Sequence, residues 1–135
     1  MGDLESHTIL PKLETYLFEI LNLFCENKLD KIKIKLNNKK SVCVVLCSNG
    51  YPNEYKKKIE IKNVSNINLK INDYLFHAGT IKENNTILAT GGRVLNFVCL
   101  SESFNESRNN IHNHLKKLNW AEGFFRKDIG YKVID

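Results

Sequence analysis

The sequence predicts an α+β fold, in which an N-terminal helix precedes a small β-rich domain with a mostly antiparallel sheet. Three observations support this class. Apolar residues recur at helical spacing near the N-terminus, about five short strand candidates follow between turns, and one capped helix comes after them. Because the strands form a run and do not alternate with helices, mainly antiparallel pairing is expected.

The N-terminal helix is expected over residues 9–25, where apolar side chains recur every three or four positions. Pro11 suits the first turn of such a helix, because the N–H that proline lacks has no intrahelical partner there. Residues 27–40 are polar and rich in lysine. We therefore place a boundary in this segment and expect two units, residues 1–40 and residues 41–135.

The strand candidates are short and bounded by turn residues. Residues 41–48 form an apolar, valine-rich run typical of a buried strand, and Asn49-Gly50-Tyr51-Pro52 ends it in a turn. A hairpin is expected at residues 83–85. The other strand candidates cover residues 58–62, 73–81, 86–90 and 93–100.

The helix after the strands is predicted to begin at Ser103, since Glu106 stands three residues later and completes a capping box. Its apolar stripe consists of Phe104, Ile111, Leu115 and Leu118. His112 and His114 lie two positions apart, so they are expected on the surface, on different faces, and not as a metal-binding pair. The tail, residues 124–134, is expected to be extended.

Charge and cysteine usage narrow the possible functions. The net charge of +5 comes mostly from lysine, but no aromatic residues alternate with the lysines, which favours a solvated surface over a nucleic-acid footprint. The sequence contains no run of about eighteen apolar residues, so no membrane-spanning helix is predicted. The four cysteines stand in apolar runs with one close pair, Cys43 and Cys47, so we expect a reduced, cytoplasmic protein without a zinc site.

Three short blocks pair glycine with charged or polar residues. They are His77-Ala78-Gly79-Thr80, Gly91-Gly92-Arg93-Val94 and Arg126-Lys127-Asp128-Ile129-Gly130. Glycine beside a cation allows backbone N–H groups and a side chain to approach one anion together. Arg93 behind Gly91-Gly92 is therefore a candidate anion-binding residue, although an exposed arginine on a hairpin turn would explain the same pattern.

Taken in order, these blocks resemble the C-terminal part of the phosphoribosylamine–glycine ligase family, in the ATP-grasp superfamily. The family motifs Gly-Gly-Tyr-Pro, His-Ala-Gly-Thr, Gly-Gly-Arg-Val-Leu and Arg-Lys-Asp-Ile-Gly match residues 49–52, 77–80, 91–95 and 126–130. Asn49 replaces the first glycine of the turn. The start, Gly2-Asp3-Leu4-Glu5-Ser6-His7, resembles a reduced form of the family signature Arg-Phe-Gly-Asp-Pro-Glu-x-Gln.

The resemblance implies an origin in de novo purine biosynthesis, where the family joins glycine to 5-phosphoribosylamine with ATP and yields glycinamide ribonucleotide, ADP and phosphate. It implies that residues 1–40 are the C-terminal end of the ATP-grasp lobe and that residues 41–135 form the C-domain, of the rudiment single hybrid motif type. The full-length family uses ATP and magnesium. No cofactor is expected for this chain alone, because it shows no pair of metal-binding carboxylates and no nucleotide-binding loop.

The chain is therefore expected to be a fragment that is inactive alone, with no catalytic and no metal-binding residue of its own. The substrate-binding residues that the resemblance implies are Arg93, Gly91, Gly92, His77, Arg126 and Asp128. His77 has a structural role as its alternative, and Arg126 with Asp128 could instead form an ion pair that pins the tail. The expected partner is the rest of the same enzyme, with a small-molecule substrate bound only in that context. The rival interpretations are a folded non-catalytic remnant and a basic nucleic-acid-binding module.

Overall fold

The structure, a computed structural model, describes residues 2–133 and contains two antiparallel sheets and three α-helices. The helices are α1 (Asp3–Ile9), α2 (Leu17–Cys25) and α3 (Phe104–Leu118). The strands are β1 (Lys40–Ser48), β2 (Ile59–Glu60), β3 (Asp73–His77), β4 (Thr80–Glu83), β5 (Thr86–Ala89), β6 (Arg93–Ser101) and β7 (Gly123–Phe124). The order β3-β6-β1-β7 forms the main sheet and β2-β5-β4 the smaller one, which confirms the predicted α+β class.

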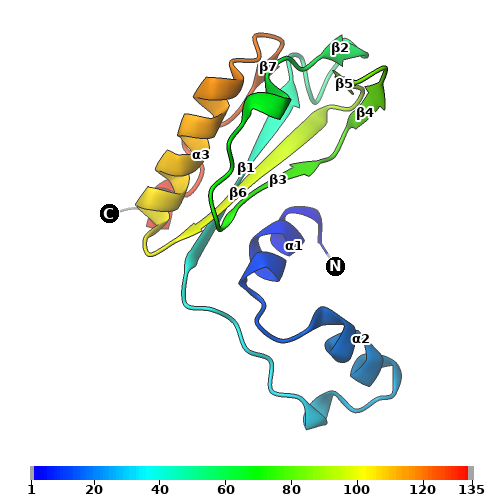
Figure 1. Cartoon of the computed structure of the whole chain (residues 1–135), viewed down its shortest axis with the longest axis vertical. Coiled ribbons are helices and arrows are strands. Elements are labelled where there is room, and N and C mark those ends of the chain that lie inside the picture. The colour runs from blue at the N-terminus through cyan, green and yellow to red at the C-terminus, as the bar shows by residue number, and fades with distance from the viewer. Residues whose placement is uncertain (1, 134–135) are drawn as a thin grey trace.

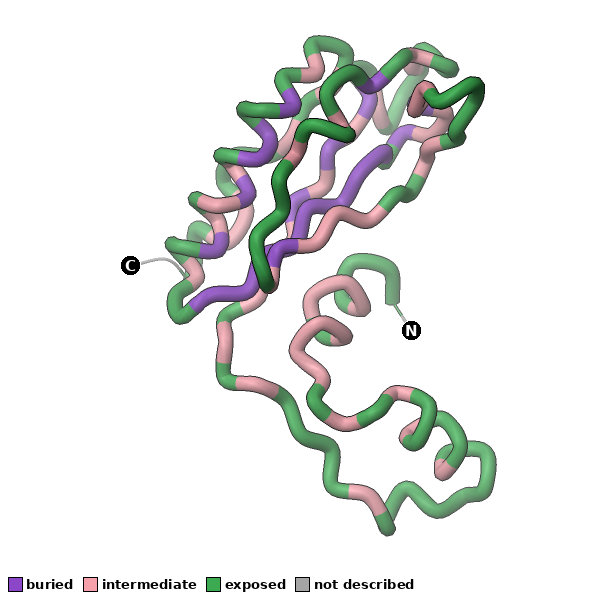
Figure 2. Tube along the Cα trace, viewed as in Figure 1, coloured by how far each residue is buried: buried purple, intermediate pink, exposed green. Residues whose placement is uncertain are grey.

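The hydrophobic core lies between α3 and one face of the main sheet (Figures 1 and 2). Val44 pairs with Phe97 and Leu46 with Leu95, and all four side chains are buried. Ile111 meets them from α3 and is fully buried. The helix begins as predicted, since the Ser103 side chain accepts a hydrogen bond from the backbone N–H of Glu106 at 3.1 Å.

The opposite face of the main sheet carries α1, which contacts both β1 and β6. The sheet is therefore covered by a helix on each face. Helix α2 and residues 26–39 form an arm that extends away from the sheet (Figure 1). No helix in the part of the chain that the structure describes is both long and apolar enough to cross a membrane.

The prediction of one helix over residues 9–25 was wrong. Helix α1 ends at Ile9, a short 3-10 turn holds Leu10–Lys12, and α2 begins at Leu17. Pro11 lies in this turn, and the next segment is extended and bonds to the returning arm. The Glu14 N–H donates to the Lys35 carbonyl at 2.9 Å, and Leu13 forms a bridge with Leu36. The backbone groups that would have continued the helix are used by this pairing.

The predicted strand over residues 73–81 is divided between the two sheets. The break falls at Gly79, between β3 and β4. Here the chain crosses the segment between β5 and β6, at Gly91. The Gly79 N–H donates to the Arg93 carbonyl at 2.9 Å, and the Thr90 N–H donates to the Gly79 carbonyl at 2.8 Å. A Cβ atom on Gly79 would lie 2.5 Å from the Gly91 Cα, so the two chains could not approach this closely with side chains.

Other predictions of local structure are confirmed, with one exception. The hairpin between β4 and β5 turns at Asn84 and Asn85, both with positive φ, as a two-residue turn requires. The turn after β1 is also present. The tail is not extended as expected, because a turn follows β7 and a 3-10 turn holds Tyr131–Val133. Ile134 lies outside the described residues.

We expect Ile111→Ala to lower the free energy of unfolding by about 2–5 kcal/mol, because it leaves a cavity in the core beneath the main sheet. Urea unfolding followed by circular dichroism measures the change. Ile71→Ala is the matched control, since Ile71 is 91% exposed and its truncation should change stability by less than ~0.5 kcal/mol. Equal losses in the two variants would contradict the location of the core.

We expect Gly79→Ala to destabilise the protein by about 1–3 kcal/mol, because the new methyl group meets backbone atoms at the crossing of the two chains. The Gly2→Ala variant is the control, since there the new Cβ meets only the movable side chain of Glu5. Thermal unfolding of both variants measures the difference. A Gly79→Ala protein as stable as the parent would show that the crossing is looser than described.

Candidate functional site

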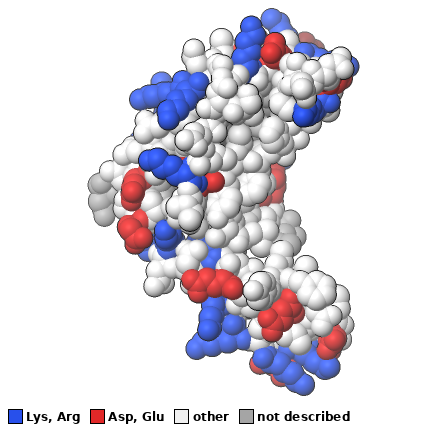
Figure 3. Space-filling model, in the orientation of Figure 1, with Lys and Arg blue, Asp and Glu red and all other residues white. Residues whose placement is uncertain are grey.

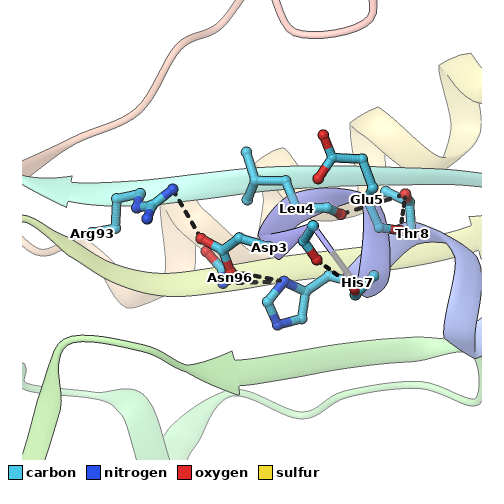
Figure 4. A network of polar contacts seen from close by, with 9 residues as sticks. Asp3, Leu4, Glu5, His7, Thr8, Arg93 and Asn96 are labelled. Carbon is cyan, nitrogen blue, oxygen red and sulfur yellow. Dashed lines mark hydrogen bonds and ion pairs between the residues drawn. The ribbon is translucent and has the colours of Figure 1, made fainter.

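Arg93 lies at the start of β6 and forms an ion pair with the N-terminal helix. Its Nη1 atom is 2.8 Å from an Asp3 carboxylate oxygen, and both side chains are about half exposed (Figure 4). The other Asp3 carboxylate oxygen is 3.8 Å from Nδ1 of His7, one turn later on α1. Because an exposed ion pair contributes little to stability, this arginine remains available to another anion that replaces Asp3.

His7 connects this ion pair to the centre of the sheet. Its Nδ1 is 3.5 Å from the amide nitrogen of Asn96, and its ring lies 4.8 Å from that of Phe76. Asn96 is buried, and its side-chain oxygen has no hydrogen-bond partner among the described residues. The signature-like residues after Met1 thus lie directly beside the start of β6, as Figure 4 shows.

The two glycines before Arg93 are held by the end of β1 and the turn after it. The Ser48 hydroxyl donates to the Gly91 carbonyl at 2.9 Å, and the Ser48 N–H donates to the Gly92 carbonyl at 2.8 Å. Gly92 packs against the ring of Tyr51, leaving no room there for a Cβ atom. The blocks at residues 49–52, 77–80 and 91–94 are separate in the sequence but meet here. The last two meet through their backbones, and the first joins them through the ring of Tyr51.

His77 does not join Arg93. It lies opposite Leu95, whose side chain is in the core beneath α3, whereas Arg93 pairs with α1 on the other face. The exposed His77 ring instead bonds through Nδ1 to the Thr80 hydroxyl at 2.9 Å. This contact joins the ends of the connection between β3 and β4, which matches the structural alternative for His77.

Arg126 and Asp128 form an exposed ion pair within the tail. The guanidinium binds the carboxylate through two contacts, of 3.0 and 2.7 Å. These contacts hold the pKa of Asp128 below its usual value and raise the pKa of Arg126. Cys47 of β1 pairs with Arg93 on one side and with Phe124 on the other, so the tail leaves from the far edge of β1. Both residues belong to the tail and stand two positions apart, so the ion pair fixes the local course of the tail.

A cavity adjoins the glycine turn but does not include Arg93. It has a volume of about 490 Å³ and is lined by Ser48, Asn49, Glu54, Tyr55, Lys56, Ile59, Trp120 and Glu122. Ser48 is common to this cavity and to the hydrogen bonds on Gly91 and Gly92. The cavity therefore lies next to the candidate anion-binding arginine, but Arg93 is not part of its lining.

Sequence reasoning missed the role of Asp3 and His7 and placed His114 wrongly. His114 is buried, not on the surface, and its Nε2 lies 2.8 Å from an Asp73 carboxylate oxygen. The signal was present, because His114 stands three residues after Ile111 and four before Leu118, on the apolar stripe. His112 is half-buried, with its ring 5.6 Å from that of Phe125.

The arrangement suits the binding of an anion and does not by itself suit phosphoryl transfer. Arg93 offers a guanidinium that can bind a carboxylate or phosphate through two parallel hydrogen bonds. Phosphoryl transfer needs metal ions around the transferred group. Among residues 2–133, the one group of three potential metal ligands is Asp73, Cys99 and His114, which lies in the core and not beside Arg93.

Comparisons with known proteins agree with the motif resemblance. The family described as phosphoribosylglycinamide synthetase, C domain, matches residues 41–132. A phosphoribosylamine–glycine ligase of Caldanaerobacter subterraneus is 38% identical over 95% of this chain and 30% of its own length. A bifunctional purine biosynthetic protein of Dictyostelium discoideum is 37% identical over the whole chain and 17% of its own length.

A solved structure agrees at the level of the fold. The crystal structure of a phosphoribosylamine–glycine ligase from Thermotoga maritima superposes with a TM-score of 0.69 at 24% identity, covering 96% of this chain and 31% of that one. The chain spans a third or less of the length of these relatives. It belongs to the phosphoribosylamine–glycine ligase family and corresponds to the C-terminal part of its members.

Proposed function

We propose that this chain supplies the C-terminal domain of a phosphoribosylamine–glycine ligase. The enzyme would join glycine to 5-phosphoribosylamine with ATP in de novo purine biosynthesis, and release glycinamide ribonucleotide, ADP and phosphate. The observation that carries the proposal is the match of nearly the whole chain to one end of a ligase at 38% identity. ATP and magnesium would bind the rest of the enzyme, without which this chain would be inactive.

We propose that residues 1–40 form the end of the ATP-grasp lobe and that residues 41–135 form the C-domain. The exposed apolar side chains of the arm support this division. Tyr16 is 82% exposed and Phe18 is 81% exposed, and Phe24 is also exposed. An apolar surface of this kind usually marks a contact with another protein surface. The remaining part of the enzyme would cover it.

Within this domain, we propose that Arg93 binds an anionic group of the substrate and that Gly91 and Gly92 let the ligand approach the backbone. Asp3 would hold the arginine until the substrate replaces it. His77 would shape the connection beside the glycine crossing, and Arg126 with Asp128 would position the tail at the margin of the site. For the compartment we propose the cytoplasm, which is supported by four cysteines that form no disulfide.

A chimeric enzyme tests the proposal. The C-terminal part of the Caldanaerobacter ligase is replaced by this chain, and release of ADP is measured with ATP, glycine and 5-phosphoribosylamine. We expect activity from the chimera that depends on all three substrates. Arg93→Ala should lower kcat/KM by about 10–100-fold, since a charged hydrogen bond contributes about 1.5–3 kcal/mol. Lys57→Ala, a charge removed from an exposed position outside the site, should leave it unchanged.

The outcomes separate the rival interpretations. A folded chimera without ADP release would mean that the chain is a non-catalytic remnant. Salt-sensitive binding of RNA by the isolated chain, lost when Lys56, Lys57 and Lys58 are changed to glutamate, would favour a basic binding module. The face drawn in Figure 3 does not favour that module, because its basic side chains form separate groups with acidic ones among them.

A further inference from the structure

Three side chains with different donor atoms meet inside the core. Asp73 on β3 and Cys99 on β6 are directly paired in the main sheet, and His114 reaches them from α3. All three are buried, and one potential ligand atom from each lies within 4.8 Å of the other two. The site is distinct from Arg93, which pairs with α1 on the other face of the sheet.

The hydrogen bonds of this cluster are incomplete. Nε2 of His114 lies 2.8 Å from an Asp73 carboxylate oxygen, and the Cys99 sulfur lies within 4.8 Å of a ligand atom of each. The other ring nitrogen of His114, Nδ1, is buried and has no partner among residues 2–133. An unsatisfied polar atom in the interior lowers the stability of the folded protein by about 1–3 kcal/mol. A contribution to stability therefore does not by itself explain this cluster.

The donor set is one that zinc binds well. Zinc takes thiolate sulfur, imidazole nitrogen and carboxylate oxygen in a tetrahedral arrangement, often with three protein ligands and one water. Two of the ligands here stand on paired strands and the third on a packed helix, so the backbone holds them in place.

One of the three residues also borders a cavity that opens to the surface. Asp73 lines an open cavity of about 260 Å³ between the β3–β6 end of the sheet and α3. Its lining includes the polar residues Lys70, Ser101, Glu102 and Glu106. Asp73 borders this cavity although its side chain is only 4% exposed, so a metal ion would reach the cluster past Asp73.

We propose that Asp73, Cys99 and His114 bind one zinc ion, with water as the fourth ligand, and that the ion ties α3 to the main sheet. The Cys99 S–H bond breaks and a sulfur–zinc bond forms, while the proton passes to solvent. His114 binds as the neutral imidazole through Nε2, and the proton that Nε2 carried moves to Nδ1. The thiolate and the carboxylate together neutralise the two charges of the ion. In the metal-free protein Cys99 is a thiol, because burial and Asp73 raise its pKa. The site is independent of the proposed ligase activity.

Titration of the whole chain with Co²⁺, followed by competition with Zn²⁺, tests the site under a reductant that contains no thiol. We expect saturation at one equivalent, a sulfur-to-cobalt charge-transfer band in the near ultraviolet, and strong visible bands typical of four-coordinate cobalt. Zn²⁺ should remove all of them. Cys99→Ser should abolish the ultraviolet band and weaken binding more than the ~10–100-fold that loss of an outer-shell partner causes.

The matched controls are Cys25→Ser and Cys47→Ser, which remove thiols outside the cluster and should keep the band. His114→Gln and Asp73→Asn should weaken binding while preserving side-chain volume, and circular dichroism of the metal-free variants checks their folding. If these variants do not fold, ¹¹³Cd NMR of the parent chain decides, because the shift of bound cadmium reports a sulfur ligand. Absence of saturable binding, or an ultraviolet band that survives in folded Cys99→Ser, would overturn the proposal.

Discussion

The long antiparallel pair of β1 and β6 is the constraint on which the rest of the structure depends. Its register runs from Lys40 opposite Ser101 to Cys47 opposite Arg93, with one irregularity near the end. A slip of one residue would exchange the two faces of the sheet. The register therefore decides that Phe97 faces α3 in the core and that Asn96 faces α1. It also brings Arg93 to the end of the sheet beside Asp3.

The crossing of Gly79 and Gly91 connects this pair to the smaller sheet and gives the candidate site its shape. The Arg93 carbonyl is engaged with the Gly79 N–H, so the backbone at this position is held while the guanidinium points toward α1. Ser48 and Tyr51 support the glycines from the end of β1. A rigid backbone beneath a long cationic side chain suits the recognition of an anion, because little ordering remains to be done on binding.

The motif order and the turn chemistry could be predicted from sequence because they are local. The apolar run of β1, the Ser103 cap and the Asn84-Asn85 hairpin depend on neighbouring residues alone. The glycine blocks identified the family because glycine is demanded by close backbone approach. Sequence reasoning could not place Asp3 beside Arg93, since the two residues are far apart in the chain. Nor could it tell that His77 and Arg93 point to opposite faces, which follows from strand register.

The sequence by itself determined the fold class, most of the strands and the family, since these depend on periodicity, turn residues and a distinctive motif order. The tertiary structure decided what the local pattern left open. Residues 13–15 pair with the returning arm and do not continue a helix, because long-range backbone hydrogen bonds replace the local ones. The spacing of apolar residues places His114 on the buried side of α3, but only the tertiary structure brings Asp73 of β3 to it as a partner. Both pairings join groups that are distant in the chain, which periodicity cannot detect.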